Sequence, residues 1–450
     1  MGATTATAVD VARLFARVAF GATPADLDAW TGKPYADMVE SLLAGAGQPI
    51  ADEAQRIVFE RQSLVGGEKR GDGRLQKAQG WWLERMRTTA HPLLERMTLL
   101  WHDHFATGRQ DPFPDTGMLI AQNELLRSHA LGSFADMVTA ITIDPAMLHW
   151  LDGVSSARPL ANENYARELF ELFTLGKYPQ TYTERDIREA ARALTGWTVN
   201  NALHTVSFQA ARHDAGTKTV LGSTFGDQGN TEYETVVALA LAQPVAPRFI
   251  AYKLVLGLGY DPGAGDLLAR PDPLVARVGD TLRRSDWDLG AAVRVLLNSD
   301  EFRYADAARG RQIVREPAEL AVAACKALNV PADQVAVTNV LDAMGQRLFE
   351  PPDVSGWSNG TAWLSPATML ARYHLSVLVF QLFSQKATGV TLPASADIDG
   401  LGRLVGLAGV SANTRAALRS YLDSQAKAPE AEKQASMLVL LLTSPDWMVV

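Results

Sequence analysis

Residues 162–176 read NENYARELFELFTLG, and this stretch decides the fold class. Apolar side chains recur in it at spacings of three and four residues, which is the pattern of one face of an α-helix. The stretch predicts a helix over 162–175 that ends at Gly176, because glycine readily adopts the backbone conformation that terminates helices. The same spacing recurs in nearly every long segment of the chain. We therefore expect a mainly α-helical protein.

The helical pattern extends over both halves of the chain. Before residue 196 it predicts further helices over 8–19, 34–44, 50–63, 74–89, 92–106, 115–129, 133–142 and 183–195. After residue 230 it predicts helices over 231–256, 272–284, 287–298, 316–328, 334–347, 366–384, 412–424 and 429–443. Thr183 followed by Asp186 resembles a capping box, which indicates that a helix begins there.

One segment departs from the helical pattern. Residues 197–229 are rich in β-branched residues, glycines and asparagines, which predict two or three short strands or a hairpin near 197–225. We expect one large multi-helical domain over 1–450. It comprises a first helical lobe over 1–196, the β-like excursion, and a second helical lobe over 230–450.

The composition argues against several classes of protein. Among 450 residues, 42 lysines and arginines oppose 50 acidic residues and give a net charge of −8, so nucleic acid is not an expected partner. The single cysteine, Cys325, excludes an internal disulfide and a cysteine-rich metal site, and its apolar helical surroundings predict a buried, inert thiol. No apolar run is long enough to predict a membrane span. Charged residues interrupt the amino-terminal apolar runs, so no export signal is expected and the location in the cell stays open.

The polar face of the helix at 162–175 is the first candidate site. At about 100° per residue, Asn164, Glu168 and Glu171 share this face and Arg167 lies beside it. Two carboxylates three positions apart can bind a divalent metal, or can divide acid and base duties when burial separates their pKa values. Arg167 would hold either Glu163 or an anionic group of a substrate. The alternative is an amphipathic helix whose acidic face is only solvated.

Residues 101–105, WHDHF, are the second candidate. On a helix, side chains two positions apart diverge by about 200°, so one face cannot present both histidines to one ion. His104 shares its side with apolar residues and is predicted to be a hydrogen-bonded core histidine. His102 is the better candidate for a metal ligand or a proton carrier.

Residues 212–219, RHDAGTKT, place a histidine, an acid and two bases in a turn of the β-like excursion. His213, Asp214 and Lys218 are candidates for binding or catalysis, because loops held by a rigid frame often carry functional residues. The other interpretation is that Asp214 only shapes the turn. A nucleotide P-loop is excluded because the lysine does not directly follow the glycine.

Residues 349–366 combine prolines and glycines with two tryptophans, Trp357 and Trp363. A loop with this many aromatic rings is expected to pack against the protein. The two rings can offer a stacking surface to a ligand, or they can seal the contact between two helical lobes. The common sequence motifs of serine hydrolases, zinc proteases and dinucleotide-binding folds do not occur in the chain.

Six motifs follow one another along the chain: WHDHFATG, NENYARELFELFTLG, REAARALTGW, RHDAGTKTVLG, PRFIAYKLV and MGQRLFEPPDVSGWSNGTAWLSPATMLAR. In this order they resemble the motifs of the bacterial domain-of-unknown-function 1800 family, over nearly the whole chain. The resemblance implies no catalytic residues, because none is established for that family. Its members are often secreted, and many are encoded beside domain-of-unknown-function 1501 proteins, which look like sulfatase or phosphatase relatives. The resemblance therefore implies such a protein as a partner.

Two functions of different classes follow from these patterns. The first is a metal-assisted hydrolytic enzyme, in which a divalent metal is held by His102, Glu168 and Glu171. The catalytic candidates are then Glu168, Glu171, His102 and His213, and the binding candidates are Asn164, Arg167, Asp214, Lys218, Trp357 and Trp363. The alternative is a non-catalytic binding or assembly partner of the co-encoded sulfatase- or phosphatase-like protein. A cleft that gathers His102, Glu168, Glu171 and His213 within metal-ligand distance favours the enzyme. An exposed apolar patch around the tryptophans, with the acids held by arginines, favours the partner.

Overall fold

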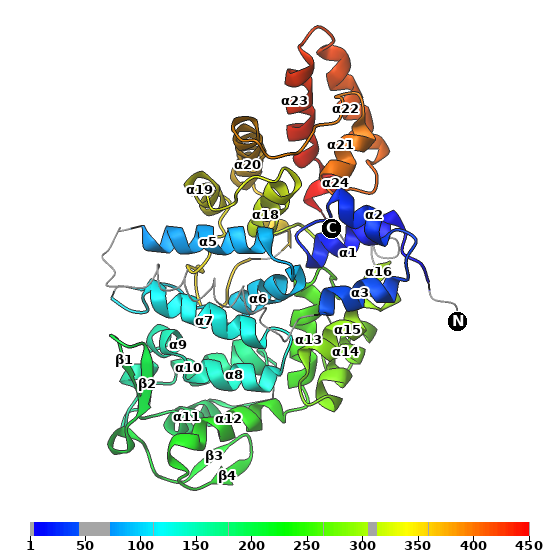
Figure 1. The fold of residues 1–450 in the computed structure, drawn as a ribbon. Coiled ribbons are helices and arrows are strands. Elements are labelled where there is room, and N and C mark those ends of the chain that lie inside the picture. The colour runs from blue at the N-terminus through cyan, green and yellow to red at the C-terminus, as the bar shows by residue number, and fades with distance from the viewer. Residues whose placement is uncertain are drawn as a thin grey trace.

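A computed structural model of the protein describes residues 4–44, 73–110, 112–178, 180–263, 265–304, 313–358 and 360–449. Helices dominate these ranges, and the strands within them form two small antiparallel sheets (Figure 1). The prediction of a mainly α-helical protein with a short β excursion is confirmed. The helix predicted over 50–63 lies outside the described residues.

The first part of the chain is a succession of helices. They are α1 (Ala8–Val18), α2 (Pro24–Trp30), α3 (Tyr35–Leu43), α5 (Arg74–Thr88), α6 (Pro92–His104), α7 (Thr116–His129), α8 (Phe134–Thr142), α9 (Pro145–Trp150), α10 (Asn164–Glu168) and α11 (Glu184–Ala193). The Thr183 hydroxyl accepts the Asp186 N–H, and the Asp186 carboxylate accepts the Thr183 N–H. The predicted capping box therefore starts α11.

The helix predicted over 162–175 has two parts. α10 passes without a break into a π-helical segment, Leu169–Thr174. Gly176 follows with a φ of +75°, a conformation that glycine adopts without strain. π-helical turns are rare in proteins, and those that occur are often found at functional sites. The π-helical segment is therefore a second reason, besides its acidic face, to consider this stretch as a candidate site.

Four short strands form the β excursion at one end of the molecule (Figure 1). β1 (Trp197–Asn200) pairs with β2 (Thr205–Phe208), and β3 (Lys218–Val220) pairs with β4 (Ser223–Phe225), both antiparallel. The excursion thus contains four strands, where two or three were expected. Strand β3 packs on α11.

Helices resume after the excursion. They are α12 (Glu232–Leu241), α13 (Ala246–Gly257), α14 (Pro273–Arg284), α15 (Leu289–Leu297), α16 (Asp300–Arg303), α18 (Pro317–Ala327), α19 (Val335–Ala343), α20 (Pro366–Gln385), α21 (Ile398–Leu404), α22 (Ala412–Ser424), α23 (Glu430–Leu442) and α24 (Pro445–Met448).

The prediction of one helix over 231–256 was wrong. The segment is broken into α12 and α13, which are bent by 79° relative to each other. Pro244 and Pro247 lie at the junction, where each ring removes a backbone donor and hinders continuation of the helix. Within the described ranges, no single helix is long and apolar enough to cross a membrane. The bent pair reaches that length and apolar composition only when its two helices are taken together.

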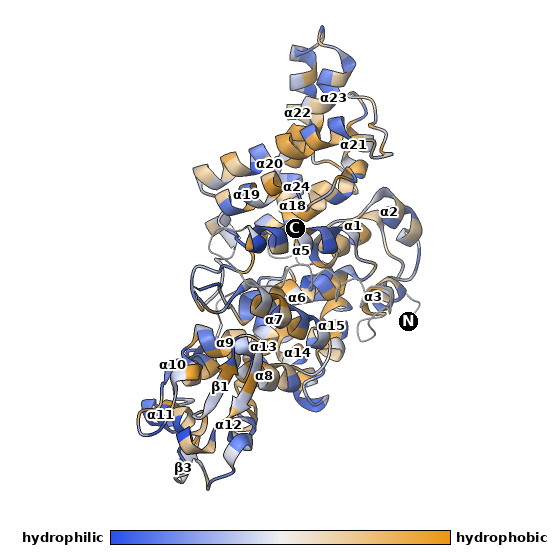
Figure 2. Cartoon of the chain, turned by 60° about the vertical axis from the view of Figure 1, so that its left-hand side comes forward, coloured by the Kyte–Doolittle hydropathy of each residue, from blue (hydrophilic) through white to orange (hydrophobic). Residues whose placement is uncertain are grey.

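Two hydrophobic cores hold the helices together. The first gathers buried residues from α1 through α16, and the second joins α5 and parts of α6 and α7 to the helices from α18 onward. α6 lies at the seam, because it packs Met97 into the first core and Leu99 into the second. Figure 2 accordingly shows hydrophobic residues on helices along the whole length of the molecule. Cys325 lies in the second core, where burial raises the pKa of its thiol to about 12, as a buried, inert thiol requires.

Candidate functional site

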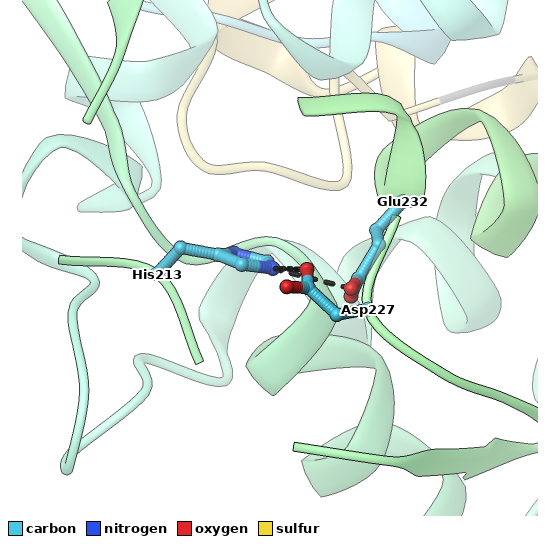
Figure 3. A group of neighbouring side chains, drawn as sticks. All are labelled: His213, Asp227 and Glu232. Carbon is cyan, nitrogen blue, oxygen red and sulfur yellow. Dashed lines mark ion pairs between the residues drawn. The ribbon is translucent and has the colours of Figure 1, made fainter. Parts of the chain in front are cut away.

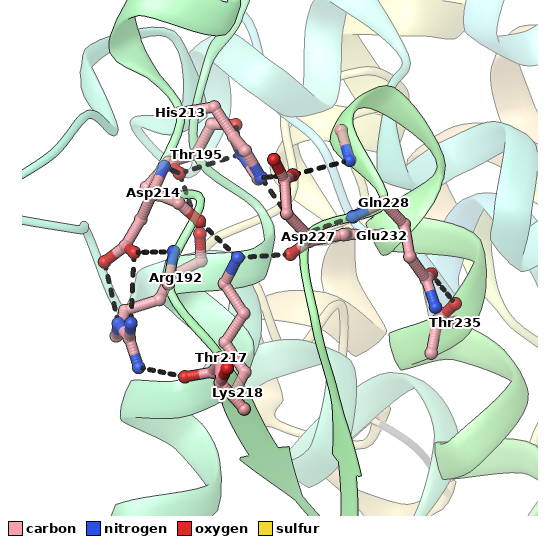
Figure 4. A network of polar contacts seen from close by, with 12 residues as sticks. Arg192, Thr195, His213, Asp214, Thr217, Lys218, Asp227, Gln228, Glu232 and Thr235 are labelled. Atoms are coloured by element: carbon pink, nitrogen blue, oxygen red, sulfur yellow. Dashed lines mark hydrogen bonds and ion pairs between the residues drawn. The ribbon is translucent and has the colours of Figure 1, made fainter.

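The RHDAGTKT motif covers the turn before β3 and the first two residues of that strand, Lys218 and Thr219. Its acid, Asp214, is held by an arginine of α11. Arg192 donates to Asp214 through Nε (2.7 Å) and Nη2 (3.0 Å), and Asp214 also accepts the N–H of Gly216 (2.9 Å). The hydrogen bonds from Arg192 outweigh the opposing effect of burial and hold the pKa of Asp214 at about 2. Figure 4 shows Asp214 turned toward Arg192. Asp214 therefore anchors the turn, which is the second of the two interpretations drawn from the sequence.

His213 is 3% exposed, and Thr195 orients its ring. Its Nδ1 lies 2.9 Å from the carbonyl oxygen of Thr195. Because a carbonyl oxygen can only accept, Nδ1 carries a proton and donates it. The opposite nitrogen, Nε2, faces two carboxylates (Figure 3), at 3.2 Å from Glu232 Oε1 and 3.8 Å from Asp227 Oδ1.

His213, Asp227 and Glu232 are spaced like metal ligands. One ligand atom from each lies within 4.8 Å of the other two, and no other three histidine, cysteine or acidic residues in the described ranges do so. His213 Nε2 makes no hydrogen bond despite its short distance to Glu232. A direct hydrogen bond between ring and carboxylate therefore does not account for the arrangement. Glu232 is fully buried whereas Asp227 is 51% exposed, so the cluster is open to solvent on one side.

Lys218 and Gln228 fix the orientation of Glu232. The Lys218 Nζ lies 2.6 Å from Glu232 Oε2, and both side chains are fully buried. Lys218 also donates a short hydrogen bond to the carbonyl oxygen of Asp214 (Figure 4). The N–H of Gln228 donates to Glu232 Oε1 (3.1 Å). Lys218 thus holds the Glu232 oxygen that does not face His213, as Thr195 holds the far nitrogen of the histidine. Such supporting contacts are typical of metal centres.

The acidic face of α10 and the π-helical segment is engaged in ion pairs. Arg167 lies 2.8 Å from Glu184 and 3.5 Å from Glu171, and Lys177 lies 3.4 Å from Glu171. Burial, followed by the negative charge of Glu171, raises the pKa of Glu168. In the described part of the chain, no histidine joins Glu168 and Glu171 in a group with metal-ligand spacing. Asn164, on the same helix, is exposed and donates to the Asp152 carboxylate (3.0 Å).

His102 and Asp103 of α6 hold the aromatic loop in place. The N–H of Phe349 donates to His102 Nε2 (3.1 Å), and burial lowers the pKa of His102 to about 3, so the ring is a neutral acceptor. Asp103 Oδ1 accepts the N–H of Trp357 (2.7 Å) at a point where a Cβ on Gly356 would collide with it. Burial also raises the pKa of Asp103 to about 7. His102 is thus engaged by loop backbone, and the structure does not bring it together with the acidic face of α10.

The side chains of His104, Trp357 and Trp363 are buried. His104 Nε2 donates to the carbonyl oxygen of Phe173 (3.0 Å), as predicted for a core histidine. Trp357 and Trp363 are 6% and 4% exposed and pack with Val314 in a small cluster of their own. The loop is therefore packed against the protein, and its two rings present no broad stacking surface.

Sequence reasoning missed Asp227 and Glu232, which the structure brings to His213. Asp227 precedes a turn, and Glu232 opens α12, where acidic residues are common because they interact favourably with the helix dipole. These local roles are the only signals that the two residues carry in the sequence. No spacing rule connects either of them to the histidine.

The comparisons with known proteins identify one family. The family model described as "Protein of unknown function (DUF1800)" matches residues 13–449. No match was found among the curated proteins, and none among the solved structures. The match spans nearly the whole chain, and its description names no activity.

Proposed function

The chain belongs to the DUF1800 family, and we propose that it is a divalent-metal-dependent hydrolase with His213, Asp227 and Glu232 as metal ligands. One observation carries the proposal: Nε2 and two carboxylate oxygens approach within 4.8 Å of one another while Nε2 makes no hydrogen bond. A bound ion would have one nitrogen and two oxygen ligands, a set that suits zinc or manganese.

The distances are close to those that an ion requires. Ligand atoms around one tetrahedral zinc ion lie about 3.3 Å apart, given bonds of about 2.0 to 2.1 Å. His213 Nε2 and Glu232 Oε1 are already 3.2 Å apart, whereas Asp227 Oδ1 is 3.8 Å from Nε2. The half-exposed Asp227 side chain has the freedom to close this gap. Three protein ligands leave one coordination position for water.

The neighbouring charges suit hydrolysis. A bound metal lowers the pKa of its water far enough to supply hydroxide near neutral pH. Lys218 acts as a positioning residue, because it fixes Glu232 through Oε2 and offsets one of the two carboxylate charges. A divalent ion would then give the site a net positive charge, which stabilises a substrate group that becomes negative in the transition state.

The metal set predicted from the sequence receives less support. His102 accepts a backbone N–H, and Glu171 is held by Arg167 and Lys177. Glu168 and Glu171 remain a candidate acid pair, because a carboxyl whose pKa is raised by burial suits a general acid. We assign the metal to the His213 cluster.

The test is metal analysis of untagged protein after removal of metal and reloading with zinc or manganese. We expect about one ion per chain in the parent and a loss of at least tenfold in affinity in His213→Ala. His204→Ala is the matched control, because His204 lies in the same excursion and also contacts a carboxylate, that of Asp115 before α7, at 3.1 Å. Equal metal content in all three proteins, or none in the parent, would refute the proposal. A metal-loaded parent would then be screened against ester, amide and phosphoester substrates.

One observation favours the alternative function, a non-catalytic partner of a sulfatase- or phosphatase-like protein. Three large apolar side chains just after Trp363 are exposed: Leu364, Leu370 and Tyr373. We propose them, in place of the buried tryptophans, as the contact surface for that role. Mixing the chain with a purified domain-of-unknown-function 1501 protein should then give a complex that Leu370→Asp abolishes. Identical sedimentation of the mixture and of the separate proteins would contradict it.

A further inference from the structure

A second polar site lies between the two cores. A cavity of about 340 Å³ is formed by residues of α1, α6, the end of α13, the segment at 313–319 and the turn at 360–361. Its polar wall includes Arg17, Arg96, Asp261, Glu316, Glu319 and Thr361. No motif in the sequence points to this cavity, because its wall comes from distant parts of the chain.

Arg96 is the central cation of this wall. It is 4% exposed, its Nε lies 2.7 Å from Glu319 Oε1, and its Nη2 donates to the carbonyl oxygen of Gly257 (2.5 Å). Nε makes no hydrogen bond despite its short distance to Glu319. Because a guanidinium carries five N–H donors in a fixed plane, Arg96 keeps donors for a ligand in the cavity.

Two more buried arginines, which do not line the cavity, interact electrostatically with the carboxylate of Glu319. Burial lowers the pKa of both Arg315 and Arg372 to about 10, and the opposing negative charge in each case is Glu319. Arg372 is 1% exposed and donates through Nη2 to the carbonyl oxygen of Arg315 (3.0 Å), whereas its Nε and Nη1 make no hydrogen bond. Burying a charge without acceptors is costly.

The charges around the cavity therefore do not balance. The positive charges are four, from Arg17, Arg96, Arg315 and Arg372, and the negative ones are three, from Asp261, Glu316 and Glu319. Glu316 is itself fixed, because its Oε2 accepts from the amide of Gln346 (2.9 Å). An anion in the cavity would supply the missing negative charge and an acceptor for Arg96.

We propose that this cavity binds a small oxyanion, the carboxylate or phosphate group of an organic ligand, on the guanidinium of Arg96. Arg315 and Arg372 add positive potential from behind, and the cavity volume suits a ligand of small-metabolite size. Arginine is the side chain best matched to both groups, because its planar fork pairs with two oxygens at once. The proposal is independent of the metal centre at His213.

The test is calorimetric titration of inorganic phosphate and of malonate at low ionic strength, in the His213→Ala background so that the proposed metal centre takes no part. Thr361 is exposed at the rim of the cavity, so changing its charge does not disturb the buried network. We expect Thr361→Lys to tighten binding and Thr361→Glu to weaken it, each by about two- to fivefold at low salt. Ser384→Glu, also exposed on a helix surface, is the matched control and should leave binding unchanged.

Arg96→Gln should weaken binding by about tenfold or more. If that variant does not fold, the two Thr361 variants decide. Binding of phosphate alone identifies a phosphate ligand, and binding of malonate alone identifies a carboxylate ligand. Absence of binding for both anions, equal affinities of the two Thr361 variants, or an equal effect of Ser384→Glu would overturn the proposal.

Discussion

Two fully buried carboxylates, Glu95 on α6 and Glu232 on α12, are stabilised in different ways. Glu95 accepts from the indole of Trp82 (2.9 Å), from Arg85 Nε (2.6 Å) and from Arg127 through Nε (2.7 Å) and Nη2 (3.0 Å). Every contact is a hydrogen bond from a donor, and the donors come from α5 and α7. Glu95 therefore ties three helices together and has no capacity left for a ligand.

Glu232 is satisfied only in part. Lys218 pairs with its Oε2 and the N–H of Gln228 donates to its Oε1, but its third neighbour, His213 Nε2, makes no hydrogen bond. The difference shows how to separate structure from function among buried charges. A saturated network fixes the packing, whereas a buried carboxylate that faces a histidine nitrogen without a hydrogen bond is the arrangement on which our proposal of a metal site rests.

The largest effect is expected at the saturated carboxylate. Glu95→Gln leaves Arg85 and Arg127 buried without a counter-charge, so it should lower the free energy of unfolding by about 3 to 5 kcal/mol. Denaturant unfolding measures this. Glu40→Gln is the control, because its pair with Arg294 is half exposed and should contribute under about 1 kcal/mol. Equal losses in the two variants would mean that Glu95 does not hold the helices together.

The pH dependence of stability should reveal the same carboxylate. Burial on its own raises the pKa of Glu95, but Arg127 and Arg85 lower it from 4.5 to about 2. Its contribution is therefore fully present above pH 4.5 and is lost as the pH falls toward 2, with a size on the order of 3 kcal/mol. Unfolding measured across this window should show a larger loss in the parent than in Glu95→Gln, because carboxylates such as Asp214, whose pKa is also about 2, lose stability in both proteins. Parallel curves for the two proteins would rule out Glu95 as its source.

The Glu232 pair should be dispensable for the fold. The double variant Lys218→Met, Glu232→Leu replaces a buried ion pair by apolar side chains of similar size, which is often neutral or stabilising. We expect the free energy of unfolding to change by less than about 1 to 2 kcal/mol and metal binding to disappear. A large loss of stability in this variant would show that the Glu232 pair is a second structural network like that of Glu95.

The smallest change in stability is expected at Asp227. Its side chain is 51% exposed, so Asp227→Asn should alter the free energy of unfolding by less than about 0.5 kcal/mol. The same change should weaken zinc or manganese binding by at least about tenfold. Asp399→Asn, at another exposed acid, should affect neither quantity. Unchanged metal affinity in Asp227→Asn would remove this residue from the ligand set.

The elements that the sequence predicted well are those built from short-range interactions. The capping box of Thr183 and Asp186, the glycine after the π-helical segment and the β excursion depend on residues within a few positions of one another. The break between α12 and α13 was equally local, since Pro244 and Pro247 were visible. The apolar spacing continues through 231–256 and favours one helix, whereas the two prolines indicate a break. The prediction followed the spacing.

The candidate site was predictable only in part. His213 and Lys218 could be named, because they share one short motif. Their partner Glu232 lies beyond the β3–β4 hairpin, at the start of α12, so no local rule connects it to them. His102 shows the opposite failure. The sequence separated the helix face of His102 from that of His104. It could not identify the partner of His102, the N–H of Phe349, which lies 247 positions along the chain.

By itself, the sequence determined the helical class, the position of the β excursion and the caps of individual helices, because these depend on periodicity and on contacts within one or two turns. Tertiary structure alone decided which polar groups share a buried space. It brought Asp227 and Glu232 to His213, turned His102 toward loop backbone and gathered three arginines around Glu319. The physical reason is that a helical period identifies a face, whereas burial and the partner across that face are set by packing.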